Sequence, residues 1–308
     1  MIWTALGLAL LLILAAPWLA ERLRPEIDAR GRRLAEGDFA ELSDGLTYYR
    51  WHGPARGPVV VCVHGLTTPS YVWLPIARAL AHLGFRVLTY DLYGRGLSDR
   101  PGGVQDSAFF LRQLRELLDD QEVTGGITLM GYSMGGAIAT AFAAEYPETV
   151  DRLVLLAPAG LGHRLGRFLE FCERVPVLGD GLIRLFGAGV HRRVVGPAGP
   201  VSSAVPDIVQ RMRGEMGYRG TLPAVLSSQR HMLTEDLEAV HRQLGRTKLP
   251  VLAIWGEEDP IIPLAALGRM AQLNRSARQV TVPGAGHGLP YTHPREVMAA
   301  ISDVLREG

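Results

Sequence analysis

Ser133 stands between glycines in the stretch GYSMGG, directly after an apolar run. The pattern Gly131-x-Ser133-x-Gly135, between a predicted strand and a predicted helix, is the setting in which a strained turn lifts a nucleophilic hydroxyl above a sheet. A glycine-rich turn with a capping serine is the alternative that the pattern alone leaves open. A serine hydroxyl is a weak nucleophile until a base takes its proton. The chemistry therefore depends on a partner elsewhere in the chain.

His287 is the preferred base among the nine histidines. It lies in the loop VPGAGHGLP, after the predicted strand RQVTV, where glycines leave an imidazole free to reach the carboxyl edge of a sheet. The alternative is a solvated loop histidine. His293 is close by, but it comes directly before Pro294, where a helix is predicted to begin.

A carboxylate is needed to hold the tautomer of the base and to stabilise its protonated form. Asp259 follows the predicted strand PVLAIWG, and the Asp-Pro pair begins a turn that leaves the carboxylate at the strand tip. Glu257 and Glu258 in the same loop are interpreted as solvated charges. The loop after the predicted strand RLVLLAP has no carboxylate before Glu170, which favours Asp259.

The elements that must position these residues alternate along the chain. Continuous apolar runs such as PVVVCVHG predict strands buried on both faces, and segments such as SAFFLRQLRELLDD have amphipathic helical spacing. This alternation predicts an α/β fold with a mostly parallel central sheet and helices on both faces. It stops between about residues 160 and 230, where helical fragments and prolines predict an insertion.

With Ser133, Asp259 and His287 in this order, the chain resembles the α/β-hydrolase superfamily from about residue 40 to its end. The stretches that carry the resemblance are VHG, DLYGRGLSDRP, GYSMGG, GEEDPIIP and GAGH. The resemblance implies the α/β-hydrolase fold and a helical cap formed by the insertion at about 160–230.

The resemblance also implies an oxyanion hole made by the backbone N–H groups of Leu66 and Met134. Losing one such donor typically costs about 3 kcal/mol of transition-state stabilisation. Structural rather than catalytic roles are implied for four residues of neighbouring loops: His64, Asp91, Arg95 and Ser98.

The implied activity is hydrolysis of carboxylic esters through an acyl-enzyme, as in serine esterases and monoacylglycerol-lipase-like enzymes. No metal or organic cofactor is expected. Serine at position 133 disfavours the branches that use an aspartate nucleophile, the dehalogenases and epoxide hydrolases. A C–C bond hydrolase or a perhydrolase-type haloperoxidase is the alternative within the fold, and a non-catalytic binding protein is a third hypothesis.

The N-terminal residues 2–20 contain no charged side chain and are apolar on every face. Nineteen residues span roughly the hydrocarbon core of a bilayer. We expect residues 1–20 to be an uncleaved membrane anchor, because the segment lacks the positive n-region and the cleavage site of a signal peptide. A signal peptide and a buried helix of the folded domain are the alternatives.

The arginines that follow this segment predict its orientation. Positive charge within this distance of a membrane span favours the cytoplasmic side. We therefore expect a single-pass anchor with the catalytic body on the cytoplasmic face. Residues 21–40 are predicted to be a charged linker, and 41–308 the hydrolase domain. The arginines are Arg22, Arg24, Arg30, Arg32 and Arg33.

Composition excludes several other classes of protein. The net charge of the 308 residues is +1, which gives no overall field for nucleic acid. Cys62 and Cys172 alone make neither a disulfide framework nor a zinc motif. The insertion at 160–230 holds ten arginines and five acidic residues. This predicts either cap helices with a solvated arginine face or a lid that rests on an anionic membrane and admits lipid-like esters.

Overall fold

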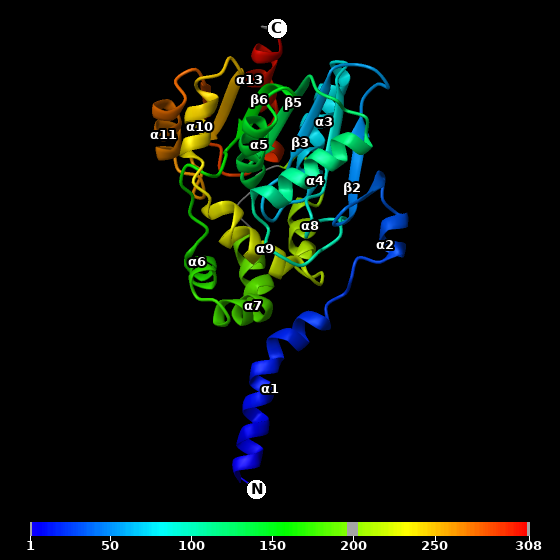
Figure 1. Cartoon of the computed structure of the whole chain (residues 1–308), viewed down its shortest axis with the longest axis vertical. Coiled ribbons are helices and arrows are strands. Elements are labelled where there is room, and N and C mark those ends of the chain that lie inside the picture. The colour runs from blue at the N-terminus through cyan, green and yellow to red at the C-terminus, as the bar shows by residue number, and fades with distance from the viewer. Residues whose placement is uncertain (1, 196–202, 307–308) are drawn as a thin grey trace.

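An eight-stranded sheet forms the centre of the molecule in this computed structural model, which describes residues 2–195 and 203–306 (Figure 1). The strand order is β1-β2-β4-β3-β5-β6-β7-β8; β2 pairs antiparallel with β1 and β4, and the remaining pairs are parallel. The predicted mostly parallel sheet is confirmed. The strands are β1 (Asp38–Leu42), β2 (Gly45–His52), β3 (Val59–Val63), β4 (Arg86–Tyr90), β5 (Ile127–Tyr132), β6 (Val150–Leu156), β7 (Val251–Gly256) and β8 (Arg278–Val282).

Helices cover both faces of the sheet, as predicted. Helices α4, α5 and α10 pack together on one face, and α3 and α13 pack on the other. The helices around the sheet are α3 (Leu74–His82), α4 (Ser107–Asp120), α5 (Met134–Glu145), α10 (Glu238–Leu244), α11 (Ala265–Leu273), α12 (Leu289–Thr292) and α13 (Pro294–Arg306), with 3-10 turns η1 (Ser70–Trp73) and η2 (Met232–Thr234).

The local sequence explains these elements. All six residues of β5 are buried, as expected for a parallel strand covered on both faces. Helix α4 begins at Asp106, whose side chain accepts a hydrogen bond from the Phe109 N–H. It buries Phe110, Leu114 and Leu117 at helical spacing on the face that packs against α5. The parallel strands consequently end at one edge of the sheet, where their loops meet.

A cluster of four helices lies at that edge, in the chain between β6 and η2 (Figure 1). It corresponds to the helical cap predicted at about 160–230, of which residues 196–202 lie outside the described residues. Two backbone hydrogen bonds of 2.8 Å join it to the sheet edge, from Arg164 N–H to the Ile261 carbonyl in the loop after β7 and from Ala204 N–H to the Tyr291 carbonyl in α12. The cap helices are α6 (Arg167–Arg174), α7 (Leu178–Val194), α8 (Ile208–Glu215) and α9 (Thr221–Arg230).

The N-terminal segment forms helix α1 (Ile2–Arg22), which extends away from the body (Figure 1). Among the described residues it is the one helix long and apolar enough to cross a membrane by length and composition. The stretch 21–40 has more structure than the predicted linker. It holds the end of α1, the short helix α2 (Ala29–Arg33) and the first residues of β1. Asp28 caps α2 by accepting a hydrogen bond from Gly31 N–H at 2.8 Å. The sequence prediction read this charged stretch as a linker and so missed the N-cap.

Candidate active site

The turn between β5 and α5 holds Ser133 at φ 55° and ψ −120°. A non-glycine residue keeps this unfavourable backbone conformation only where the surrounding structure imposes it. Its N–H donates to the Leu156 carbonyl at 3.0 Å, which ties the turn to β6. A Cβ at Gly131 would lie 2.3 Å from the Gly135 carbonyl oxygen, and a Cβ at Gly135 would lie 2.2 Å from that of Val63. Glycine is therefore required at both positions for the backbones to approach.

The structure brings together the three side chains predicted for the site. His287 Nε2 lies 3.0 Å from Ser133 Oγ, and His287 Nδ1 lies 2.7 Å from Asp259 Oδ2. The other carboxylate oxygen, Asp259 Oδ1, accepts from the N–H groups of Ile261 at 2.8 Å and Ile262 at 2.9 Å. Because a carboxylate oxygen accepts, Nδ1 carries the imidazole proton, and Nε2 is left to accept the serine proton.

Burial keeps this arrangement in place. The Asp259 side chain is fully buried, and the His287 side chain is 16% exposed. The imidazole ring packs against the Tyr132 ring, with centroids 5.2 Å apart. Of the alternatives weighed from the sequence, Glu257 and Glu258 are exposed, as predicted.

His293, the other histidine near the predicted base, has a different partner. Its Nδ1 lies 2.8 Å from Thr292 Oγ1, at the end of the short helix α12.

The loop after β3 lies against the serine on the side where the oxyanion hole is predicted. A Cβ on Gly65 would lie 3.3 Å from Ser133 Cβ, so this loop, which continues to Leu66, touches the turn. Met134 opens α5, whose N-terminal N–H groups and dipole favour negative charge. Leu66 and Met134 are both buried. Met134, at the start of α5, and the loop that continues to Leu66 therefore both adjoin Ser133.

His64 supports this loop with both ring nitrogens. Its Nδ1 donates to the Gly65 carbonyl at 2.8 Å, and its Nε2 accepts from the Leu92 N–H at 2.8 Å. Burial lowers the pKa of His64 to about 3, so the ring is neutral at physiological pH. A fully engaged neutral imidazole has no free lone pair for catalysis, which agrees with the structural role predicted for it.

Asp91 and Ser98 close the loop after β4, as their predicted loop-shaping role requires. The Asp91 carboxylate accepts from Ser70 N–H at 2.8 Å and Leu97 N–H at 2.9 Å. The Ser98 hydroxyl donates to the Asp91 carbonyl at 2.6 Å and accepts from Tyr48 N–H at 2.9 Å.

Arg95 makes a connection that the sequence does not reveal. Its fully buried guanidinium donates from Nε to the Leu66 carbonyl at 2.9 Å. Its Nη1 donates to Gln105 Oε1 at 2.6 Å, and its Nη2 donates to Ser228 Oγ at 2.8 Å on cap helix α9. Burial lowers the pKa of Arg95 to about 9, so it stays charged at neutral pH. One side chain thus joins the predicted oxyanion loop to the cap.

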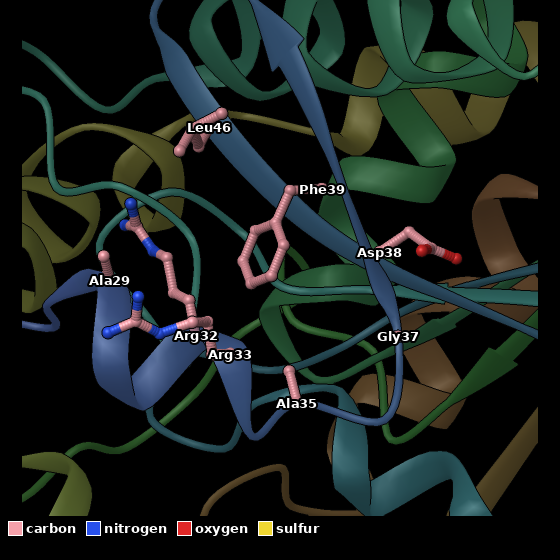
Figure 2. Close-up of a pocket in the computed structure, with 8 residues that line it drawn as sticks. All are labelled: Ala29, Arg32, Arg33, Ala35, Gly37, Asp38, Phe39 and Leu46. Carbon is pink, nitrogen blue, oxygen red and sulfur yellow. The ribbon is translucent and has the colours of Figure 1, made fainter.

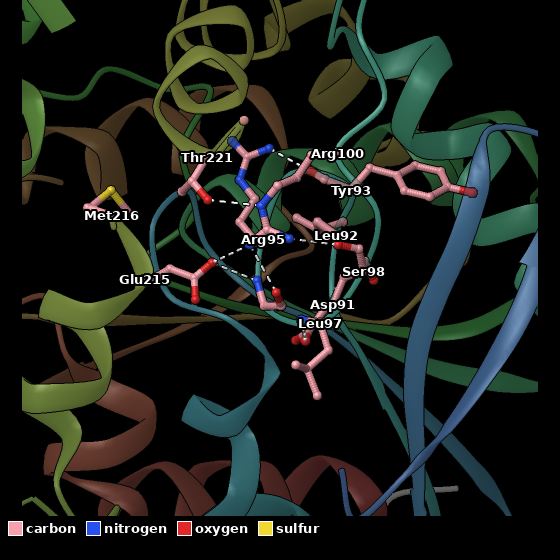
Figure 3. A network of polar contacts seen from close by, with 12 residues as sticks. Asp91, Leu92, Tyr93, Arg95, Leu97, Ser98, Arg100, Glu215, Met216 and Thr221 are labelled. Atoms are coloured by element: carbon pink, nitrogen blue, oxygen red, sulfur yellow. Dashed lines mark hydrogen bonds and ion pairs between the residues drawn. The ribbon is translucent and has the colours of Figure 1, made fainter. Parts of the chain in front are cut away.

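Glu215 forms a second connection between the cap and the loop after β4 (Figure 3). Its Oε1 accepts from Gly96 N–H at 2.7 Å and lies 3.4 Å from Arg100 Nη2. Arg100 in turn donates to Thr221 Oγ1 at 3.0 Å, at the start of α9. Burial raises the pKa of Glu215 to about 7. The cap is therefore held by a buried carboxyl group that titrates near physiological pH.

A groove of about 440 Å³ lies away from these residues, between α2 and the first hairpin (Figure 2). Arg32 and Phe39 line it, and none of the three triad side chains does. Arg32 is already engaged there, with Asp99 Oδ1 at 2.5 Å and the Leu97 carbonyl at 3.1 Å. Among residues 2–195 and 203–306, no group of His, Cys, Asp and Glu side chains is arranged to hold a metal ion.

Known proteins share this architecture. The family model for the alpha/beta hydrolase fold matches residues 58–294. Lipase 1 of Psychrobacter immobilis is 26% identical over 274 residues, which cover 87% of this chain and 80% of the lipase. A haloalkane dehalogenase of Mycobacterium marinum is 31% identical over 225 residues, 70% of this chain and 73% of the relative. The crystal structure of a hydrolase from Pseudomonas aeruginosa superposes with a TM-score of 0.71 at 27% identity, covering 88% of this chain and 99% of that one.

Proposed function

This chain belongs to the α/β-hydrolase fold family, and we propose that within it the protein is a serine hydrolase that cleaves carboxylic esters. The observation that carries the proposal is the double contact of His287, at 3.0 Å from Ser133 Oγ and 2.7 Å from Asp259 Oδ2. This is the geometry by which a histidine activates a serine hydroxyl while a carboxylate holds its tautomer. The similarity to a bacterial lipase supports the same activity.

In the proposed reaction Ser133 Oγ attacks the ester carbonyl carbon and forms a C–O bond, while its proton passes to His287 Nε2. The N–H groups of Leu66 and Met134 stabilise the resulting oxyanion. When the tetrahedral intermediate collapses, the bond to the leaving alkoxide breaks and His287 returns its proton to that oxygen. A water molecule then repeats the sequence on the acyl-enzyme, which releases the acid and restores the serine.

Position 133 favours this reaction over that of the similar haloalkane dehalogenase. The aspartate-nucleophile branches require a carboxylate at the tight turn, and this chain has serine there. C–C bond hydrolysis and perhydrolysis would use the same serine and remain the alternative reactions.

We further propose that α1 anchors the protein in a membrane as a single-pass helix, with the catalytic body on the cytoplasmic side. The length and apolar character of Ile2–Arg22 and the arginines that follow it support this arrangement. The contacts of Glu21 and Arg24 with the cap support retention of the segment over cleavage as a signal peptide. Lipid-like esters, such as acylglycerols, are the substrates that an enzyme beside a bilayer would meet.

The test is an activity profile of the full chain in detergent on p-nitrophenyl esters from acetyl to palmitoyl, with a fluorophosphonate label. We expect ester turnover and a label on Ser133. In the Ser133→Ala protein the label should disappear and kcat should fall by at least about 10³-fold. Turnover of β-diketones without turnover of any ester would establish the C–C alternative. Unchanged hydrolysis by a folded Ser133→Ala protein would refute the proposal.

A further inference from the structure

Helix α1 docks on the cap, not on the sheet. Its last turns pack against α7 (Figure 1). A Cβ on Gly181 of α7 would lie 3.4 Å from Pro17 Cγ, an ordinary van der Waals distance, so the two helices are in close contact at this point. The Arg184 guanidinium lies 5.5 Å from the centre of the Trp18 ring.

Polar contacts fasten the end of α1 to the cap. Arg24 donates to the Met216 carbonyl at 2.8 Å and to the Arg184 carbonyl at 2.9 Å. Glu21 pairs with Arg24 at 3.0 Å and accepts from Gly220 N–H at 2.7 Å. The Glu21 and Arg24 side chains are only 10% and 15% exposed. These contacts reach both α7 and the turn before α9, so the orientation of α1 determines which face of the cap is turned toward a bilayer.

The exposed large apolar side chains of the body are concentrated on this cap. Among the described residues after position 35, seven of the ten exposed large apolar residues belong to it. Val177 is 74% exposed and Val194 is 71% exposed. The seven are Phe171, Val177, Leu178, Leu185, Phe186, Val194 and Val209, and the other three are Leu83, Val104 and Leu264. An apolar concentration of this kind marks an interaction surface.

This apolar surface is continuous with α1. Leu178, Gly181 and Leu185 lie at helical spacing on one side of α7, and Gly181 is the residue that Pro17 approaches. Leu178 and Leu185 are therefore on the side of α7 from which α1 emerges. In Figure 1, α7 is the part of the body beside the exit of α1, α6 packs next to α7, and the sheet lies beyond the cap.

Exposed arginines accompany the apolar side chains. Arg174 lies just before Val177, and Arg192 and Arg193 lie just before Val194. All three are exposed. Apolar side chains interleaved with arginine are typical of helices that lie in the interface of an anionic membrane.

We propose that the outer face of α6 and α7, centred on Val177, Leu178, Leu185 and Phe186, is a membrane-binding surface that enters the headgroup region of an anionic phospholipid bilayer. This inference rests on the proposed membrane anchor and not on the proposed reaction. A bilayer crossed by α1 begins where the helix leaves α7, and these side chains stand at that level. The cap would then lie between the bilayer and the sheet edge that carries Ser133.

The test uses the full chain reconstituted in phosphatidylglycerol–phosphatidylcholine vesicles, with a polarity-sensitive fluorophore on an introduced thiol. Both native thiols, Cys62 and Cys172, are buried, so the label goes to the new position. Val177→Cys and Phe186→Cys report on the proposed surface. Leu83→Cys is the matched control, because Leu83 is 60% exposed at the end of α3, outside the cap.

We expect brominated or spin-labelled lipids to quench the probes at 177 and 186 several-fold more than the probe at 83. The difference should shrink in vesicles of phosphatidylcholine alone. Equal quenching at all three positions would overturn the proposal. The proposal would also be overturned if the cap probes became shielded as the protein density rises but were not quenched by the labelled lipids. That result would indicate that a second copy of the chain covers this surface.

Hydrolysis of a short soluble ester by the same labelled proteins separates this test from that of the reaction. Retained hydrolysis without lipid quenching would defeat the membrane surface alone. Lipid quenching without hydrolysis would leave the surface intact and defeat the proposed reaction.

Discussion

The sheet edge that carries Ser133 and the cap above it are held in place by different means. At the sheet edge, backbone groups set the geometry: Ser133 N–H bonds to β6, and two backbone N–H groups hold the Asp259 carboxylate. The cap is joined to the same edge largely by buried charged side chains, above all Arg95 and Glu215. The candidate triad is therefore held mainly by backbone hydrogen bonds, whereas the position of the cap depends on a few groups that are costly to bury.

The largest expected effect comes from the triad, where Asp259→Asn tests the backbone-held region. An asparagine Oδ1 can still accept from the N–H groups of Ile261 and Ile262, so the loop should keep its shape. Its amide would face His287 Nδ1 as a donor and select the wrong tautomer. We expect kcat to fall by about 10⁴-fold with little change in thermal unfolding. Activity within tenfold of the parent protein would contradict the assignment.

Arg95→Met tests whether the cap and the predicted oxyanion loop are coupled. The change removes the Arg95 donor from the carbonyl of Leu66 and one of the two donors to Gln105 Oε1. A small displacement of a catalytic group costs up to about 10²-fold in rate, so we expect kcat on a soluble ester to fall by roughly tenfold to a hundredfold. The assay is run well below the unfolding temperature and measures kcat and KM separately.

Arg95→Lys is the control for that experiment, since it keeps the charge but loses the forked donors and should recover only part of the rate. If Arg95→Met lowers the unfolding temperature and leaves kcat unchanged, Arg95 has a structural role alone.

Glu215 makes the stability of the folded protein depend on pH. Its folded-state pKa is raised from 4.5 to about 7 by burial, so the folded protein binds more protons than the unfolded chain between these values. The free energy of unfolding therefore falls as the pH rises from about 4.5 to about 7, by as much as about 3 kcal/mol from this one group. Glu215→Gln removes the titration. We expect the free energy of unfolding, measured in urea, to differ less between pH 5 and pH 8 for this variant than for the parent. An equal difference in the two proteins would count against titration of Glu215 as the cause.

The smallest effect is expected from an exposed ion pair far from both regions. Arg115 and Asp119 pair across one turn on the surface of α4. Exposed pairs of this spacing contribute about 0.3–0.5 kcal/mol. Asp119→Ala removes the pair and leaves the Arg115 side chain over the Tyr146 ring, so it should change the free energy of unfolding by no more than about 0.5 kcal/mol, and its kcat should equal that of the parent. A larger loss would show that the buried charges of the cap are not exceptional.

The proximity of the three candidate site residues was predictable because each follows a strand with a clear apolar pattern. Ser133, Asp259 and His287 come after β5, β7 and β8, and parallel strands bring their carboxyl ends to one edge. The contacts of the cap were not predictable in the same way. Arg95 and Ser228 are 133 positions apart, and no local pattern announces their hydrogen bond. The docking of α1 on α7 likewise brings together Pro17 and Gly181, which are 164 positions apart, with no local pattern that predicts the contact.

The backbone of Ser133 has a consequence for the evolution of such a protein. A non-glycine residue at φ 55° and ψ −120° carries a conformational penalty of roughly 1–3 kcal/mol, from which glycine would be free. A chain with glycine at 133 would therefore be the sturdier molecule and would have no nucleophile. Selection for thermal resistance alone would therefore act against the serine that we propose as the nucleophile.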